Sequence, residues 1–165
     1  VNDIFNDSNF PNLNGDLLIN CLESFKMPPG RGEILSLNKF KIIDDSYNAN
    51  PESVKAALDH LSGFQECRKF FVFGDMKELG ANEEILHKKV GQYAVGKTDI
   101  LLTVGKLAKN AQSNSNNFAL SLHFNDNFSL LEKLNELLTD GDIVLIKGSR
   151  SMQLDQLINE LKNVK

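Results

Sequence analysis

Three short stretches of the sequence carry more carboxylates, amides and cations than a turn needs. They run over residues 44–51, 74–80 and 147–151, and each follows an apolar run and precedes a helical pattern. In α/β proteins this order puts a loop at the carboxyl end of a strand, where ligands bind. The simpler alternative is that each stretch only begins a helix, through an Asx or Ser cap or through acids that favour the helix dipole.

The fold that these stretches imply would bring them to one edge of a sheet. That edge would then offer carboxylates, amides and cations from parts of the chain about a hundred residues apart. The side chains concerned are Asp45, Asp75, Glu78, Asn48, Asn50, Lys147 and Arg150. Such a set suits a ligand with hydroxyl groups and charge, such as a nucleotide or an amino-acid derivative.

No catalytic residue is indicated by the sequence. It contains no G-x-S-x-G motif and no cysteine with a plausible histidine partner. It also lacks G-x-x-x-x-G-K-[ST] and G-x-G-x-x-G, the usual devices for holding phosphates. The three histidines are scattered and the two cysteines, Cys21 and Cys67, have no metal-ligand spacing, so no metal site is predicted. The loops by themselves could at most bind a ligand.

Composition narrows the class of protein. The 165 residues are 41% hydrophobic and 24% charged, which is typical of a globular domain with a real core. A net charge of -4 argues against a general binder of nucleic acids or anionic membranes. No apolar run approaches the roughly 20 residues that span a bilayer. Two unpaired thiols favour a reduced, cytoplasmic setting.

Hydrophobic periodicity from Glu33 onward predicts strands that alternate with helices. The predicted strands are 34–37, 40–43, 69–73, 100–104, 119–124 and 142–146, the first two forming a hairpin. The predicted helices are 52–61, 82–95, 105–111, 129–138 and one from 150 or 151 to 161, with a polar loop at 114–117. This alternation indicates an α/β fold with a doubly wound, mostly parallel, Rossmann-like sheet and an N-terminal β-hairpin strand.

The residues before this pattern form a separate part of the chain. Residues 1–15 are rich in Asn and Asp and predict a poorly ordered tail, and residues 16–25 predict a helix with Asp16 as its cap. The sequence M-P-P-G-R-G at 27–32 then predicts a linker between two structural units. A first residue in mid-pattern suggests a fragment of a longer protein.

Five motifs in this order resemble the carboxy-terminal domain of the Mur ligase family. They are G-R-G-E at 30–33, I-D-D-S-Y-N-A-N-P at 43–51, G-D-M-K-E-L-G at 74–80, L-L-T-V-G at 101–105 and V-L-I-K-G-S-R at 144–150. The second and third are most similar to the member that adds D-alanyl-D-alanine to UDP-N-acetylmuramoyl-tripeptide. The resemblance implies that residues 1–28 are the tail of a central ATPase domain with its linker, and that 29–165 are the carboxy-terminal domain.

The resemblance also implies an activity and its substrates. The family's enzymes use ATP to phosphorylate the carboxylate of a peptidoglycan precursor, and the amine of the incoming compound attacks the resulting acyl phosphate. ATP, UDP-N-acetylmuramoyl-tripeptide, D-alanyl-D-alanine and the protein's own upstream domains are the implied partners, with Mg²⁺ held mainly upstream. No nucleic acid or membrane is implied, and we expect a monomer. Since the phosphate-binding loop lies upstream, we expect residues 1–165 alone to be inactive.

Site roles follow from the matched motifs. For ATP the resemblance implies Arg31, Asp45, Tyr47 and Asn48, with Asp45 at the ribose. For D-alanyl-D-alanine it implies Asn50, Lys147, Ser149 and Arg150. Asp75 and Glu78 would shape their loop or orient the amine, and Gly30 and Gly32 would form a hinge for domain closure.

Three alternatives stay open at this point. One is a related ligase domain, using another amino acid or folate. Another is a phospho-acceptor receiver domain, which is also doubly wound and carries paired acids (here Asp44 and Asp45), a further Asp (Asp75) and a Lys (Lys147). The third is an interaction domain without catalysis, which would leave the three polar loops unexplained.

Overall fold

The structure is a computed structural model that describes residues 28–37 and 39–163 and, in the preceding segment, residues 15, 19, 20 and 24. Apart from those four positions, the tail predicted over 1–15 and the helix predicted over 16–25 lie outside the described residues. None of the helices in the described part of the chain has both the length and the apolar character needed to cross a lipid bilayer.

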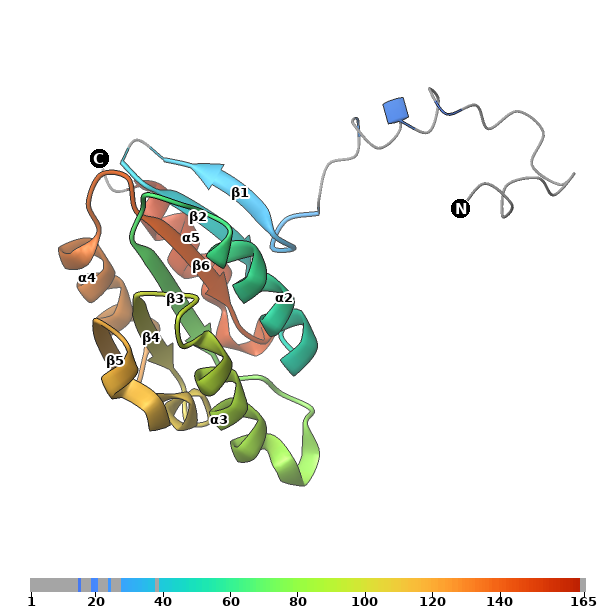
Figure 1. Ribbon diagram of the computed structural model, residues 1–165, viewed down its shortest axis with the longest axis vertical. Coiled ribbons are helices and arrows are strands. Elements are labelled where there is room, and N and C mark those ends of the chain that lie inside the picture. Colours follow the sequence, from blue (N-terminus) through green and yellow to red (C-terminus); the bar gives the residue numbers. More distant parts are fainter. Residues whose placement is uncertain (1–14, 16–18, 21–23, 25–27, 38, 164–165) are drawn as a thin grey trace, which may run out of the picture.

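A six-stranded sheet forms the centre of the domain (Figure 1). Its spatial order is β1 (Glu33–Ser36), β2 (Lys41–Asp45), β6 (Ile143–Lys147), β3 (Lys69–Gly74), β4 (Ile100–Val104) and β5 (Leu120–Phe124). Strand β1 is antiparallel to β2, and every other neighbouring pair is parallel. The predicted mostly parallel sheet with a hairpin strand is therefore confirmed.

Helices cover both faces of this sheet. On one face lie α2 (Pro51–Ser62), α3 (Glu83–Ala94) and the 3-10 segment η2 (Ala108–Asn117), and on the other lie α4 (Asn127–Leu137) and α5 (Leu154–Asn163). Figure 1 shows α2 and α3 in front of the sheet and α5 behind it. The predicted doubly wound architecture is confirmed.

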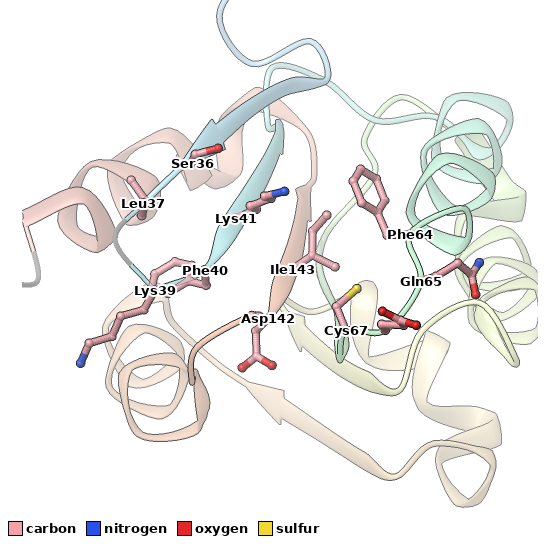
Figure 2. Close-up of a pocket in the computed structure, with 12 residues that line it drawn as sticks. Ser36, Leu37, Lys39, Phe40, Lys41, Phe64, Gln65, Cys67, Asp142 and Ile143 are labelled. Carbon is pink, nitrogen blue, oxygen red and sulfur yellow. The ribbon is translucent and has the colours of Figure 1, made fainter.

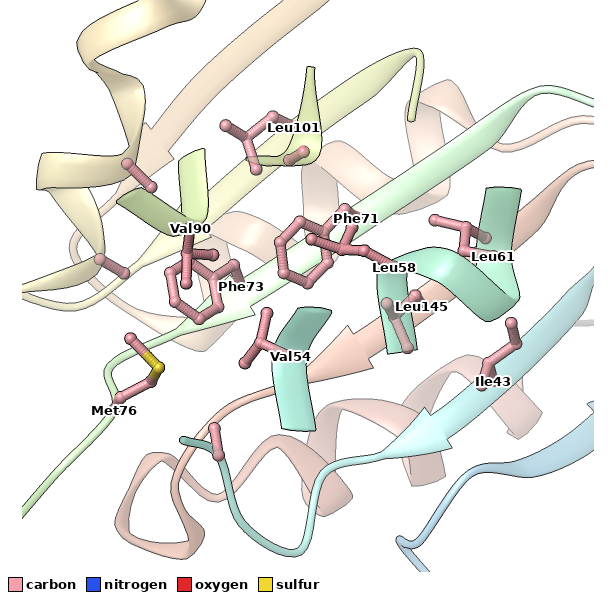
Figure 3. Close-up of a cluster of buried hydrophobic side chains, with 14 of the residues drawn as sticks. Ile43, Val54, Leu58, Leu61, Phe71, Phe73, Met76, Val90, Leu101 and Leu145 are labelled. Atoms are coloured by element: carbon pink, nitrogen blue, oxygen red, sulfur yellow. The ribbon is translucent and has the colours of Figure 1, made fainter. Parts of the chain in front are cut away.

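Strand β3 shows why two covers are needed. It is a continuous apolar run whose side chains alternate between the faces, as in any β-strand. Phe71 and Phe73 pack with Val54 and Val90 of α2 and α3 (Figure 3). Phe70 and Val72 belong to the second cluster, with the apolar side chains of α4 and α5. A strand that is apolar on both sides must be buried on both sides, and helices on the two faces of the sheet bury β3 in this way.

The last strand, β6, lies between β2 and β3. The chain leaves β2 and β3 toward the face of α2 and α3, but leaves β6 toward the opposite face, where α5 lies. The loops at the carboxyl ends of these three strands therefore diverge, and the diverging loops leave a crevice of the kind in which α/β proteins bind ligands. All three polar stretches of the sequence end at this crevice.

The structure differs from the predicted secondary structure in two regions, residues 105–117 and the start of the closing helix. The helix predicted at 105–111 and the loop predicted at 114–117 are replaced by η2, a 3-10 segment with a kink at Asn114. Its Asn- and Ser-rich sequence accounts for this, because short polar side chains compete for backbone hydrogen bonds and disfavour a regular α-helix. The closing helix begins later than predicted, since Gln153, at φ 53°, separates the 3-10 turn η3 (Arg150–Met152) from α5.

Candidate functional site

Two hollows at the carboxyl edge share Tyr47, an exposed residue that follows β2. One, of 220 Å³ and here called the first sub-cleft, is lined chiefly by Arg31, Asp45, Asn48, Asn50 and Lys147. The other, of 250 Å³ and called the second sub-cleft, is lined by Asn48, Lys77, Glu78, Ser149, Arg150 and Ser151. Tyr47 lines both. The structure thus brings the three polar loops together.

An ion pair between neighbouring strands forms the floor of the first sub-cleft. Lys147, at the end of β6, is only 2% exposed, and its Nζ donates hydrogen bonds to Asp45 Oδ2 (2.5 Å) and to the Asn48 carbonyl oxygen (3.0 Å). Burial raises the pKa of the Asp45 carboxyl above its ordinary value, and the hydrogen bond and charge of Lys147 oppose that rise. A residue predicted for the nucleotide and one predicted for the dipeptide are therefore direct partners.

The segment before β1 adds a cation to this hollow. Gly30, at φ 75°, accepts a hydrogen bond from the Tyr47 amide (3.0 Å), and the Gly32 amide donates to the Asp44 carbonyl oxygen (2.7 Å). A Cβ on Gly30 would lie 3.1 Å from the Tyr47 nitrogen, so glycine suits this position on both counts. These bonds hold the Arg31 guanidinium 4.3 Å from the centre of the Tyr47 ring.

Asn50 caps the helix that follows the loop. Its Oδ1 accepts from the Ser53 amide (2.9 Å), and the Ser53 Oγ accepts from the Asn50 amide (3.1 Å), a reciprocal capping box. The neighbouring Asn48 Oδ1 accepts from the Ala49 amide (2.8 Å). The simpler capping role considered for this loop is therefore present, and both asparagines also line the first sub-cleft.

The second sub-cleft is held together by bonds between the loops after β3 and β6. The Ser149 amide donates to the Asp75 carbonyl oxygen (2.9 Å), and the Lys77 amide donates to Ser149 Oγ (2.8 Å). Asp75 itself is buried: its Oδ1 accepts from the Leu107 and Ala108 amides and its Oδ2 pairs with Lys77. Its side chain therefore shapes the loops, one of the two roles considered for it.

His87 is a further residue of this region, and its position in α3 gave no sign of a role. It is fully buried, its Nε2 accepts a hydrogen bond from the Met76 amide (2.8 Å), and its Nδ1 lies 2.6 Å from the Glu83 carbonyl oxygen. These partners fit a neutral ring with the proton on Nδ1. Burial lowers the pKa of His87 below its ordinary value. His87 therefore anchors the loop that carries Lys77 and Glu78.

A larger cavity, of 470 Å³, lies at the opposite edge of the sheet (Figure 2). It is bordered by the starts of β2 and β6 and by the residues just before β3, including Lys41, Cys67 and Ile143. Asp142 lines it too, but its carboxylate is bonded to Arg68. None of the three polar loops reaches this edge, so the candidate site remains the crevice around Tyr47.

The residues present do not suggest a resident metal. In the described part of the chain, no three or more His, Cys, Asp or Glu side chains are placed so that they could hold a metal ion.

One protein family and several curated proteins match most of this chain. The sequence profile of the family described as "Mur ligase, glutamate ligase domain" matches residues 30–150. The chain is 35% identical over 149 residues to UDP-N-acetylmuramoyl-tripeptide–D-alanyl-D-alanine ligase of Bacillus subtilis, which covers 85% of this chain and 32% of that protein. The chain spans about a third of the length of the curated relatives that it matches.

Solved structures share the fold. The crystal structure of MurF from Acinetobacter baumannii superposes with a TM-score of 0.80 at 26% identity, over 92% of this chain and 34% of that one. MurF ligase from Thermotoga maritima, solved in complex with ADP, superposes with a TM-score of 0.75 at 24% identity, over 89% of this chain and 36% of that one. At 24% identity, the likeness to the Thermotoga structure concerns the fold alone.

Proposed function

The chain belongs to the Mur ligase family, and on this premise we propose that residues 29–165 are the carboxy-terminal domain of an ATP-dependent amide ligase. The parent enzyme would add D-alanyl-D-alanine to UDP-N-acetylmuramoyl-tripeptide in peptidoglycan precursor synthesis. The reaction named for the relative from Bacillus subtilis supports this choice of substrates. We further propose that the enzyme acts in the cytoplasm and as a monomer.

The observation that carries the proposal is the meeting of the three polar loops at one crevice. Carboxylates, amides and cations from β2, β3 and β6 surround Tyr47. An acyl phosphate is readily hydrolysed, so the reaction needs a surface that closes over it, excludes water and aligns the attacking amine. A rigid rim of hydrogen-bonding groups on a separate domain is suited to that task.

We assign the nucleotide to the first sub-cleft and the dipeptide to the crevice beside it. Arg31, Asp45, Tyr47 and Asn48 would contact ATP, with the Asp45 carboxylate accepting from the ribose hydroxyls. Ser149 and Arg150 would border the dipeptide in the second sub-cleft, and Asn50 and Lys147, which line the first sub-cleft, would border it from the side of the nucleotide. Asp75 would keep the loops in place, and Glu78 would orient the amine. Mg²⁺ would be held by the upstream domains, where the phosphate-binding loop also belongs.

The alternatives differ in how well the fold accommodates them. A receiver domain has the strand order 2-1-3-4-5, in which the first two strands are neighbours. Here the first two parallel strands, β2 and β3, are separated by the last one, β6, so the topology argues against a receiver. A related ligase for another amino acid or folate shares the fold, and only a substrate test separates it from the dipeptide enzyme.

The test is phosphate release from ATP by the full-length enzyme that contains this chain. We expect release only when both UDP-N-acetylmuramoyl-tripeptide and D-alanyl-D-alanine are present, and at least a tenfold fall for Asp45→Ala. Release with a single amino acid but not with the dipeptide would identify a different ligase of the family. Release that needs neither compound would overturn the proposal. Residues 1–165 alone should release none.

A further inference from the structure

The cavity of 470 Å³ at the edge where the parallel strands begin is separate from the crevice of the proposed function. The segment before β1 joins the domain at the crevice, where the Tyr47 amide donates a hydrogen bond to the Gly30 carbonyl oxygen (3.0 Å). The cavity therefore lies at the end of the domain away from that connection. Its volume is typical of pockets that hold small organic molecules.

The cavity exists because α2 does not cover this face of the sheet to its end. The helix ends at Ser62, and the loop that follows leads to the start of β3. Beyond the helix, the sheet contributes Lys41 of β2 and Ile143 of β6, which are neighbours in the strand register. The loop contributes Phe64 and Cys67, both half-buried.

Hydrogen bonds hold both walls of the cavity in place. On one side, Lys69 Nζ donates to the Phe64 carbonyl oxygen (3.0 Å), which ties the loop after α2 to β3. On the other side, the Gly141 amide donates to the Lys39 carbonyl oxygen (2.8 Å), which ties the β1–β2 hairpin to the segment before β6. Walls that are fixed before a ligand arrives lower the entropic cost of binding.

The charges that line the cavity favour an anion. Asp142 lines it, but both of its carboxylate oxygens accept hydrogen bonds from Arg68, at 2.9 and 2.6 Å. Among the described residues, the other charged side chains of the lining, Lys39, Lys41 and Glu66, take part in no ion pair. Two cations and one carboxylate leave a positive balance, which attracts a negatively charged ligand.

Lys41 is the cation that points into the hollow. Figure 2 shows the Lys41 ammonium group, the Phe64 ring and the Cys67 sulfur directed toward one space beside Ile143, whereas Lys39 extends away from it. The cavity thus combines an inward cation with an aromatic ring and an aliphatic side chain. A ligand with an anionic group on an apolar body matches this combination, because a charge-assisted hydrogen bond fixes its orientation and the apolar walls bury its body.

We propose that this cavity is a second ligand site, which binds a small organic carboxylate with an aromatic body. Lys41 binds the carboxylate, and the aromatic ring packs between Phe64 and Ile143. A neutral compound gains no charge-assisted bond, and a cation has to pair with Glu66 against the charge of two lysines. The site is independent of the proposed ligase activity, since none of its lining residues lines either sub-cleft.

Alkylation of Cys67 by iodoacetamide reports whether the cavity is occupied, because this residue lines it. The probe is phenylpropionate, added at constant ionic strength to the full-length enzyme without ATP or substrates, and mass spectrometry quantifies the labelled Cys67 peptide. We expect saturable protection with a Kd of a few millimolar or lower, so that labelling slows about tenfold at ten times Kd. Other cysteines of the protein, measured in the same digest, should be labelled at an unchanged rate.

Matched compounds and variants test the role of charge. Phenylpropionamide, which is neutral, and phenylpropylamine, which is a cation, should each bind at least about fivefold more weakly than phenylpropionate. Lys41→Gln should weaken phenylpropionate by a similar factor, Lys41→Arg should retain most of the affinity, and Glu66→Gln should increase it about twofold. Lys88→Gln, which removes an exposed lysine of α3 outside the cavity, should change nothing.

The comparison of the three compounds decides the inference on the wild-type protein, even where a variant fails to fold. No protection of Cys67 at about 30 mM phenylpropionate, or equal protection by all three compounds, would overturn the site. Stronger protection by the amine would show that Glu66 controls the cavity and would overturn the choice of a carboxylate. Phosphate release from ATP tests the proposed function separately, and its failure would leave this binding result unaffected.

Discussion

At the scale of single residues, the pair of Lys147 and Asp45 is the most consequential contact of the site. The ammonium is almost completely buried and the carboxylate is about one-fifth exposed. Removing one partner of such a pair is costly, because the other charge then stays desolvated without compensation. The pair therefore ties β6 to β2 at the crevice, besides any contact with a ligand.

We predict that Lys147→Met destabilises the chain by about 3 to 5 kcal/mol, the range for a buried pair that loses one member. Urea unfolding followed by circular dichroism would measure this loss. The variant should also raise the pKa of Asp45 further, since Lys147 opposes the rise that burial causes, and carbon NMR of the carboxyl group would detect the direction.

The double variant Asp45→Asn/Lys147→Met is the control for this prediction. It has no unpaired charge and should be clearly more stable than Lys147→Met alone. If the single variant loses less than about 1 kcal/mol, then the pair is energetically no more than a surface contact.

Most of the site residues could be predicted from the sequence, but the ion pair between Lys147 and Asp45 could not. Asp45, Lys147 and Arg150 could be predicted because polar residues directly after an apolar strand are typical of the ligand-binding edge of an α/β sheet. That Lys147 binds Asp45 follows from β6 lying beside β2, which periodicity does not reveal. His87 could not be predicted as an anchor, since an isolated histidine on an amphipathic helix resembles any other core residue.

At the scale of elements, α3 determines the shape of the loop after β3 through His87. The buried ring is neutral and its Nε2 accepts from the Met76 amide. A protonated ring could not accept that bond, because both of its nitrogens would be donors. The stability of the loop is therefore linked to pH.

We predict that the free energy of unfolding falls as pH drops below the ordinary histidine pKa of about 6.5. Burial lowers the pKa of His87 in the folded state, so the unfolded chain takes up the proton first. The contribution is complete above that pH and is lost at up to about 1.4 kcal/mol per pH unit below it. Urea unfolding at several pH values from 7.5 to 5 would measure the slope.

His87→Gln is the comparison for this pH dependence. It should be less stable than the wild type at pH 7.5, because the buried hydrogen bonds are disturbed, but it should lose less stability between pH 7 and 5. The same slope in both proteins would show that protonation of His87 is not the cause.

A second contact between elements joins α3 to η2. Gly91 faces the backbone of Ala111, and a Cβ on Gly91 would lie 2.0 Å from the Ala111 carbonyl oxygen. We predict that Gly91→Ala destabilises the chain by about 3 kcal/mol, although alanine favours a helix by about 1 kcal/mol over glycine. Chemical denaturation would measure the difference.

Gln92→Ala is the matched control in the same helix. Residue 92 is exposed, so this change should be neutral or slightly stabilising. Stability of Gly91→Ala equal to that of Gln92→Ala would mean that η2 can move away at little cost.

Secondary structure was predicted more accurately for elements whose form depends only on the burial of apolar residues than for elements that depend on long-range hydrogen bonds. The buried strands at 69–73 and 100–104 are continuous apolar runs, and the structure confirms both. The helix predicted at 105–111 was wrong because the Asn- and Ser-rich sequence forms the 3-10 segment η2 instead. The start of this segment is held by Asp75, whose carboxylate accepts from the Leu107 and Ala108 amides, and such a long-range contact leaves no local pattern in residues 105–108.

At the scale of the whole molecule, the site exists because the last strand is inserted into the middle of the sheet. Strand β6 brings Lys147 and Arg150 next to loops that precede them by seventy to a hundred residues. The crevice is therefore formed only when the complete sheet is present. The predicted alternation of strands and helices gave the architecture but could not give this order, because alternation is the same for several doubly wound topologies.

The two hydrophobic clusters lead to a prediction about the extent of the folding unit. Among the residues that the structure describes, the members of both clusters lie between Leu35 and Leu161. We predict that a chain of residues 28–165 unfolds in one transition. Its free energy of unfolding should lie within about 0.5 kcal/mol of that of residues 1–165, and the dependence of this free energy on urea concentration should agree within about 10–15%.

A chain that ends at Ser151 should not fold, because it lacks four apolar residues of the second cluster, Leu154, Leu157, Ile158 and Leu161. Circular dichroism and amide NMR spectra of both chains would test this pair. A loss of more than about 2 kcal/mol in the first chain would place the domain boundary before residue 28, and a folded second chain would show that α5 is not needed to cover the sheet.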